Sequence, residues 1–301
     1  GFTVTDVAGE VIEGRTLNPE QYAAWVDWTD PISGTSMGTP RGAGEGMRGS
    51  PRFAEMVINA PKSLSIAAAL HPEVSDALDA AQQDAAEEIR RWLAQHSVTR
   101  IGPRHAREVV PVQRLQTIAV THKTSRAGDP HRHIHFQIGT RVYAAGKWRG
   151  LDTAALFKQQ GAVRALGTAI IAAHRRLAAV LDKHGLTLDP ATGEVAELEP
   201  FNAALSKRGA QVERNLATFE ADWEAAHPGE EPGPVVRARL KAKAWEHERP
   251  GKKPTVLGSE AGWRVELEDA GYSPGAPRAH RPVPVALDEL ALDVGGVERG
   301  A

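Results

Sequence analysis

Four of the twelve histidines fall within fourteen residues: His122, His131, His133 and His135. The segment that holds the last three is rich in β-compatible residues, and residues two apart on a strand share a face. Their imidazoles therefore point the same way, while the apolar residues between them point to the opposite side, where a core would lie. Because neutral imidazole is a common ligand of divalent metals, this pattern predicts a metal site.

A further imidazole is expected from the preceding strand. His122 ends the apolar run 115–121, and the polar turn 123–130 follows it. Pairing the two strands as a hairpin brings His122 beside His133 and His135, and three converging imidazoles form a site with coordination positions left open. His131 lies further from the paired region, and we predict that it contacts phosphate or solvent. The alternative for the whole cluster is a run of surface histidines that binds no metal.

A carboxylate in an apolar strand is a candidate partner of this site. Glu55 lies in the run 53–59 among apolar neighbours, and an unpaired buried carboxylate is costly. A ligating histidine usually donates its second ring N–H to a carboxylate or a carbonyl, so we predict this role for Glu55. A solvent-facing position on the strand is the alternative.

The composition restricts the available chemistry. The 301 residues contain no cysteine, which excludes disulfides, thiolate zinc sites and cysteine nucleophiles and fits a reducing compartment. No apolar stretch reaches the ~18–20 residues of a membrane span, and the first residues do not form a signal peptide. We therefore expect a cytoplasmic protein with no membrane partner. The net charge is −2, but seven Lys and Arg against two Glu in 237–253 predict a local basic face.

Hydrophobic periodicity and turn signals indicate the elements that position these residues. We expect strands at 53–59, 108–112, 115–121 and 131–144, a hairpin at 186–198, and helices at 19–28, 63–70, 72–96, 151–183, 201–226, 234–248 and 259–270. Two consecutive strands have connections too short for a parallel crossover, which predicts an antiparallel sheet. The expected fold class is α+β, with a central antiparallel sheet of about five strands flanked by helices and a C-terminal helical lobe.

Several spaced motifs resemble those of the MobF-type conjugative relaxases, which belong to the HUH endonuclease superfamily. Residues 55–65, EMVINAPKSLS, are similar to the family signature DLTFSAPKSVS. Residues 122–135, HKTSRAGDPHRHIH, resemble its pattern HxTSRxxDPxxHxH, with the same step from His122 to His133. Further likenesses are GKWRGLD at 146–152, SKR at 206–208 and AHPGEEPG at 226–233, the last typical of the actinobacterial branch. The resemblance is continuous over about 53–272 and weaker over 17–38.

This resemblance implies an antiparallel sheet, a three-histidine metal centre, and site- and strand-specific nicking of plasmid DNA at a transfer origin. His122, His133 and His135 would be the ligands, and Glu55 stands where the family has an aspartate that hydrogen-bonds a ligand histidine. Manganese or magnesium is the family's expected ion, whereas three nitrogen ligands by themselves also suit zinc. In the family's reaction a tyrosinate attacks the scissile phosphorus, becomes linked to the 5′ phosphate and releases a 3′ hydroxyl.

The chain departs from the family at the nucleophile. The family's catalytic tyrosines lie near the extreme N-terminus, usually as a Tyr-Tyr cluster, whereas this chain contains Tyr22, Tyr143 and Tyr272. Tyr22 is a minor candidate because it lies in the helix that follows the nucleophile segment in the family. The expectation we favour is that the natural protein begins before Gly1, and that the family's helicase region follows Ala301.

Cationic and aromatic side chains near the motifs are candidate DNA contacts. We predict that Arg126 contacts phosphate at the catalytic centre and that the other DNA-binding residues are Lys62, Lys147, Trp148, Arg149, Lys207 and Arg208, with Trp148 stacking on a base. The expected partners are single-stranded or hairpin DNA of the transfer origin, other relaxosome proteins and a coupling protein.

The domain prediction follows from the same features. We expect an α/β relaxase core at 1–200 that lacks its N-terminal catalytic segment, and a helical lobe at 201–272 that closes over DNA. Residues 273–301, rich in Pro and Gly, are expected to form an extended tail or linker.

Two other functions fit parts of the sequence. A binding module without a nucleophile would hold single-stranded DNA and metal but cut nothing, and a denaturing gel of a labelled origin strand separates it from the enzyme. An unrelated histidine-metal hydrolase would bind metal with no salt-dependent affinity for single-stranded oligonucleotides.

Overall fold

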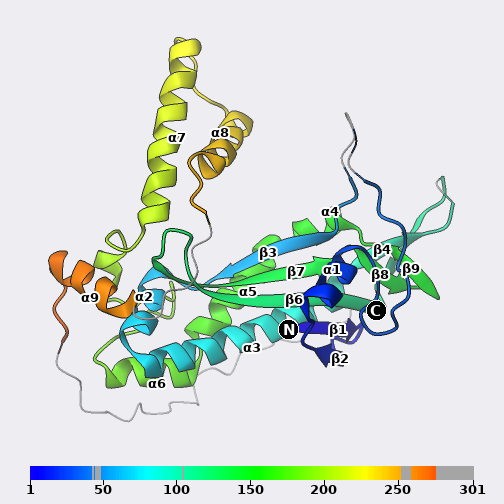
Figure 1. Cartoon of the computed structure of the whole chain (residues 1–301), viewed down its shortest axis with the longest axis horizontal. Coiled ribbons are helices and arrows are strands. Elements are labelled where there is room, and N and C mark those ends of the chain that lie inside the picture. Colours follow the sequence, from blue (N-terminus) through cyan, green and yellow to red (C-terminus); the bar gives the residue numbers. More distant parts are fainter. Residues whose placement is uncertain (43, 45–48, 104, 252–258, 276–301) are drawn as a thin grey trace, which may run out of the picture.

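The computed structural model describes residues 1–42, 44, 49–103, 105–251 and 259–275. Its centre is an antiparallel sheet with helices on both faces, as predicted for an α+β fold (Figure 1). The strands are β1 (Phe2–Asp6), β2 (Val11–Arg15), β3 (Phe53–Asn59), β4 (Val98–Ile101), β5 (Glu108–Pro111), β6 (Arg114–Thr124), β7 (Pro130–Gly139), β8 (Arg141–Ala144) and β9 (Lys147–Gly150). The helices are α1 (Pro19–Val26), α2 (Lys62–Leu70), α3 (Pro72–His96), α4 (Thr153–Lys158), α5 (Gln160–Ala172), α6 (Arg175–Lys183), α7 (Lys207–Ala226), α8 (Pro234–Glu246) and α9 (Ser259–Asp269).

Within the described part of the chain the main sheet has seven strands, against the expectation of about five. Their order is β2-β1-β6-β7-β3, with β8 paired to β6 and to β9, and every pairing is antiparallel. Of the strands that were not expected, β9 follows the predicted run 131–144, and β1 and β2 come from the first fifteen residues. Phe2 and Val4 are buried and alternate with polar neighbours, which is the period-two pattern of a strand covered on one face.

One face of the sheet is closed mainly by α3 and α5. Ile134, Phe136 and Ile138 of β7 are buried there with Ile89 and Leu93 of α3. Because strand side chains alternate, the residues between these three must point to the opposite face. The packing of α3 thus decides which side of β7 carries the histidines.

The opposite face is covered at one end by α1. Trp25 is buried, and its Nε1 donates to Gln116 Oε1 at 3.0 Å. The other buried members of this small core are Phe2, Val4, Trp28, Met37 and Ile118. At the other end of the same face, near the β6–β7 turn, the histidines lie beyond α1.

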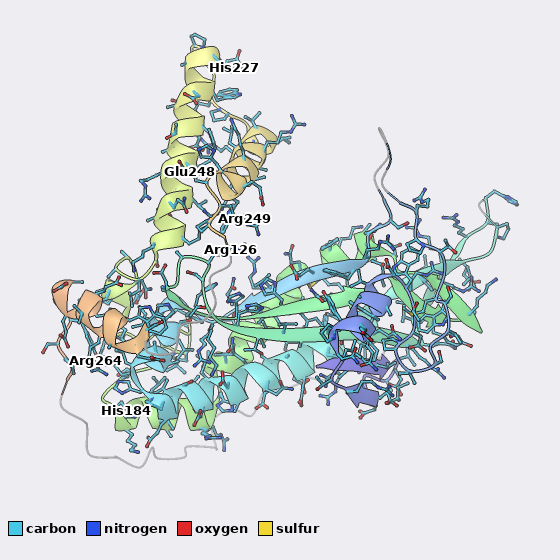
Figure 2. The ribbon with its side chains drawn as sticks, viewed as in Figure 1. Arg126, His184, His227, Glu248, Arg249 and Arg264 are labelled. Carbon is cyan, nitrogen blue, oxygen red and sulfur yellow. The ribbon has the colours of Figure 1, made fainter. Side chains whose placement is uncertain are left out.

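Helices α7 and α8 project from the body as a paired arm (Figure 1). The two helices bury Val212, Phe219 and Ala244 between them, and His227 marks the far end of α7 (Figure 2). Helix α9 returns to the body, where Trp263 and Leu267 join the core of α2, α3 and α6. The predicted lobe 201–272 therefore contains an arm and a body helix, and its boundary at 200 stays a prediction. Most of the predicted tail, residues 276–301, lies outside the described residues.

The predicted helix 151–183 is divided into α4, α5 and α6. The Asp152 side chain accepts from the Ala155 amide and begins α4, and the His174 ring accepts from the Leu177 amide and begins α6. Such side-chain caps satisfy amides that have no partner within the helix. The predicted hairpin 186–198 has one isolated bridge, Leu188 to Val195. None of the described helices is both long enough and apolar enough to cross a membrane.

Removal of one side chain tests the packing of α3 under the sheet. Ile89 is fully buried, so Ile89→Ala should lower the free energy of unfolding by about 3 kcal/mol, through lost burial and the cavity left behind. Glu87→Ala, on the exposed side of the same helix, should change it by less than about 0.5 kcal/mol. Urea denaturation followed by circular dichroism measures both. Equal effects of the two substitutions would contradict the described packing.

Candidate functional site

The pairing of β6 with β7 brings the three predicted imidazoles together. His122 stands directly opposite His133, and Val120 stands opposite His135, which places His122 diagonally from His135. The ring centroid of His122 lies 5.2 Å from that of His133 and 4.9 Å from that of His135, and the last two rings are 5.1 Å apart. The expectation that a hairpin brings these side chains together is confirmed.

Two of the three rings are held through Nδ1. His135 Nδ1 lies 3.1 Å from Glu55 Oε1, and His133 Nδ1 lies 2.9 Å from the backbone oxygen of His131. An ionised carboxylate and a carbonyl can only accept, so both Nδ1 atoms carry the proton and both Nε2 atoms are left as ligand atoms. Glu55 therefore makes the predicted contact despite its extra methylene group.

The donor set fits a divalent cation, but the rings are not yet in a coordinating arrangement. Among the described residues, no group of three or more His, Cys, Asp or Glu side chains could hold an ion as it stands. The ring nitrogens of the three histidines therefore have to move before they can converge on one ion. Burial lowers the pKa of His133, which favours the neutral form that a ligand must have.

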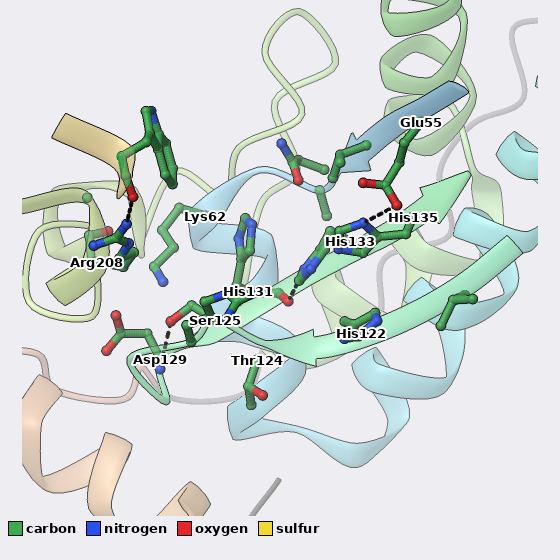
Figure 3. A pocket seen from close by; sticks show the side chains of 18 of the residues that line it. Glu55, Lys62, His122, Thr124, Ser125, Asp129, His131, His133, His135 and Arg208 are labelled. Atoms are coloured by element: carbon green, nitrogen blue, oxygen red, sulfur yellow. Dashed lines mark hydrogen bonds and ion pairs between the residues drawn. The ribbon is translucent and has the colours of Figure 1, made fainter. Parts of the chain in front are cut away.

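The histidines line a cleft of about 1190 Å³ between the sheet and the base of the arm (Figure 3). Its floor comes from β3, β6 and β7, and its other side from the start of α7 and the end of α8. Among the described residues, four cations line it, and two carboxylates, Glu55 and Asp129, partly offset them. The cations are Lys62, Arg126, Arg208 and Arg249.

Burial shifts the pKa of three further groups in the cleft. Lys62 Nζ donates to the Pro130 carbonyl at 2.7 Å, and desolvation lowers the pKa of Lys62 to about 8 although the nearby Asp129 carboxylate raises it. The Asp129 side chain is 1% exposed, and burial raises its pKa. His131 also lines the cleft, and burial lowers its pKa to about 4. His131 is thus neutral at pH 7, and a phosphate contact by it would be that of a neutral group.

The base of the arm is anchored on the β6–β7 turn. Arg126 donates to the Pro250 carbonyl at 3.5 Å, and Trp263 Nε1 of α9 donates to the Gly128 carbonyl at 3.0 Å. Lys207 Nζ, at the start of α7, lies 2.7 Å from Glu266 and 3.7 Å from Asp129. The turn that separates the two histidine strands therefore also positions the arm above them.

Trp245 of α8 was not among the predicted residues, yet it lines the cleft. Its side chain is 48% exposed, which is high for a tryptophan. The Arg208 guanidinium lies 5.4 Å from the indole centroid and donates to the Trp245 backbone oxygen. Sequence periodicity alone does not show which side of an arm helix faces the cleft. The only sequence signal for Trp245 was its position as an aromatic residue within the basic stretch 237–253.

Four of the predicted DNA contacts do not line the cleft. Lys147, Trp148 and Arg149 lie on β9, towards the opposite end of the sheet from the β6–β7 turn (Figure 1). Trp148 packs against the core beneath α1 and against Tyr143 at 5.6 Å between ring centroids. Lys207 is occupied by Glu266. The basic residues Lys252 and Lys253 lie outside the described residues.

The three tyrosines are in different surroundings. Tyr22 lines the cleft, and its hydroxyl donates to Gln137 Oε1 at 3.0 Å. Tyr272 is buried in the core with α9, and Tyr143 lies on β8. Of the three, Tyr22 alone is among the described residues that line the cleft.

The chain matches the family model of the TrwC relaxase over residues 3–270. The chain belongs to the TrwC relaxase family. Relaxases are DNA-nicking enzymes, so the predicted enzyme class is confirmed. The match covers the histidine strands, the cleft and the arm.

Solved structures of the conjugative relaxase TrwC share this fold. A metal-free complex with OriT DNA aligns with a TM-score of 0.62 and 19% identity, covering 90% of each chain. A complex with a 27-mer DNA that comprises the recognition hairpin and the cleavage site has a TM-score of 0.62 and 18% identity, covering 91% of this chain and 93% of that one. A metal-bound complex gives 0.62 and 19%, covering 91% and 90%. The comparison with curated proteins found no significant match.

The charge of Lys62 should respond to Asp129. Because burial holds the pKa of Lys62 near 8 against its usual 10.5, the unfolded state binds one more proton between these values, and this group makes stability rise with pH across that window. Asp129→Asn removes the charge that raises the pKa and should move it below about 8. NMR titration of the lysine Cε and Nζ resonances measures the pKa.

Glu73→Gln serves as the control, because Glu73 pairs with the remote Lys183. A titration of Lys62 near 10.5 in the unchanged protein would contradict the described burial.

Proposed function

We propose that this relaxase cuts one DNA strand at a plasmid transfer origin, and that His122, His133 and His135 hold the divalent cation of the reaction. The observation that carries the proposal is the meeting of three imidazoles on one sheet face within a cationic cleft. The solved TrwC structures contain OriT DNA in metal-free and metal-bound forms, which supports a DNA substrate and a bound metal for this chain.

Imidazole suits this role because its metal-binding form is neutral. Neutral ligands leave the full charge of the ion for the substrate, and the chemistry supplied when it is bound is neutralisation of charge on a non-bridging phosphate oxygen. Glu55 and the His131 carbonyl hold two of the rings through Nδ1. Nitrogen donors favour manganese or zinc over magnesium, and we propose manganese as the first ion to test.

The cationic wall of the cleft is proposed to hold the DNA backbone. Lys62, Arg126 and Arg249 line it from three separate elements and would contact successive phosphates of a single strand. The Arg208 guanidinium already donates hydrogen bonds to Gln211 and to the Trp245 backbone oxygen within the arm. Its proposed role is therefore to orient Trp245. Lys147 and Arg149 are proposed to contact DNA beyond the cleft.

The arm is proposed to close over the strand, with Trp245 as the base-stacking residue in place of Trp148. An exposed indole beside cations is the usual platform for single-stranded nucleic acid. Relaxosome proteins and a coupling protein remain proposed partners. A cytoplasmic location also remains a proposal. The binding-module alternative keeps every one of these contacts and differs only in the absence of cleavage.

A cleavage assay tests the function. The protein, in full as its gene encodes it, is incubated with Mn²⁺ and a labelled strand that carries the hairpin and nick region of its own transfer origin. A denaturing gel should show a shorter strand and a protein-linked fragment, both abolished by chelator. His133→Ala should lower the nicking rate by at least about a hundredfold, because it removes a proposed ligand, while His227→Ala at the far end of α7 should leave it unchanged (Figure 2).

Nicking that survives chelation and His133→Ala would contradict the metal centre. Salt-dependent strand binding without any nicked product would favour the binding module.

Single-strand affinity tests the stacking role of Trp245. Trp245→Ala should weaken binding of an origin oligonucleotide about tenfold, the size of one lost base–aromatic contact, and Trp245→Phe should retain most of the affinity. The slope of affinity against salt should stay unchanged, because no charge is removed. Fluorescence anisotropy measures both quantities. Trp223→Ala, on α7 beside His227, is the matched control, and equal effects of the two alanine variants would contradict the assignment.

A further inference from the structure

A series of hydrogen bonds joins α1 to a proposed metal ligand. Tyr22 Oη donates to Gln137 Oε1 at 3.0 Å, and Gln137 Nε2 donates to Glu55 Oε1 at 3.4 Å. The same carboxylate oxygen lies 3.1 Å from His135 Nδ1. All four side chains line the cleft, and Figure 3 shows the last pair, Glu55 and His135.

The direction of each bond in this series is fixed by chemistry. The Glu55 carboxylate can only accept, so the Gln137 amide must present its NH₂ group to it. The amide oxygen then faces Tyr22, and the phenol must donate. Each group thereby sets the orientation of the next. Tyr22 donates to Gln137, and Glu55 Oε1 accepts from both Gln137 and His135.

The strand register explains why Glu55 needs this support. Glu55 is the cross-strand neighbour of Gln137, whereas the neighbour of His135 on β3 is Val57. Glu55 therefore reaches His135 along a diagonal, across a longer separation than a direct cross-strand pair. Its side chain is 37% exposed and loses rotamer freedom when it is held there. Gln137, only 9% exposed, is the fixed group that can limit this freedom.

We propose that Gln137 is a positioning residue for the metal centre: anchored by Tyr22, it holds Glu55 in the rotamer that orients the His135 ring. This inference rests on the proposed function and deepens it. It also assigns Tyr22 a role as anchor, because its hydroxyl proton is donated to a neutral amide oxygen and no basic group lies in the series beside it.

The first test needs no metal. Gln137→Met keeps the side-chain length and removes both hydrogen-bonding groups, and Tyr22→Phe removes only the anchoring hydroxyl. In nitrogen-15 NMR spectra, the His135 Nδ1–H signal should be present in the unchanged protein and should broaden or shift upfield in both variants. Gln83→Ala is the matched control, since Gln83 also donates to a glutamate, Glu87, but on the exposed side of α3. An unchanged His135 signal in both variants would overturn the proposal.

The second test measures affinity for Mn²⁺ by electron paramagnetic resonance of the free ion. Loss of a direct partner of a ligating imidazole weakens binding about 10- to 100-fold, so Gln137→Met, acting through that partner, should weaken it about 3- to 10-fold. In a Glu55→Ala background the same substitution should have almost no further effect, because the two act in series.

The outcomes separate this inference from the proposed function. Independent, multiplicative effects of Gln137→Met and Glu55→Ala would overturn the positioning role, and so would an unchanged affinity in Gln137→Met. Failure of the unchanged protein to bind Mn²⁺ or Zn²⁺ would instead contradict the metal centre, while the NMR result would still decide whether Gln137 holds Glu55.

Discussion

The hydrogen-bonded register between β6 and β7 is the constraint on which the site depends. His122 pairs with His133 across the strands, and the period of two in β7 adds His135 on the same face. A slip of β7 by one residue would turn His133 and His135 into the core that Ile134 and Phe136 now fill, away from His122 on β6. The packing of α3 under the sheet therefore maintains the histidine face as much as it maintains the fold. The turn between the strands has a second task, because it anchors the arm.

The cleft combines proposed imidazole ligands with cationic walls, and burial acts on both, because it lowers the pKa of His133 and that of Lys62. Desolvation lowers the pKa of His133 and of His131, which keeps imidazoles neutral near the proposed ion. The surrounding cations come from α2, the β6–β7 turn and the arm, so a strand of DNA would touch parts of the chain far apart in sequence. In this arrangement, the proposed closure of the arm would also bring its cations against the DNA backbone.

Much of the body could be predicted from the sequence, because its signals are local. The predicted bounds of β3 and α3 agree with the structure, since β-compatible residues stopped by Pro61 mark 53–59 and a helical stripe marks 72–96. The contact of Glu55 with His135 could be proposed but not decided, because it depends on a diagonal reach between strands. The sequence could not show which tryptophan lies at the cleft. Trp148 packs against the core under α1, whereas Trp245 lies on the arm and lines the cleft, and both positions depend on tertiary packing. Strands β1 and β2 were missed because they are short, and because β1 pairs with β6, more than a hundred residues away, while β2 pairs only with β1.

The central claim is that three imidazoles from two adjacent strands bind one ion. Crystals of the protein soaked in Mn²⁺, measured with X-rays tuned to the manganese absorption edge, test it directly. We predict one anomalous peak within bonding distance of a ring nitrogen of His122, His133 and His135. A peak bound to fewer than two of these rings, or held by other side chains of the cleft, would contradict the account.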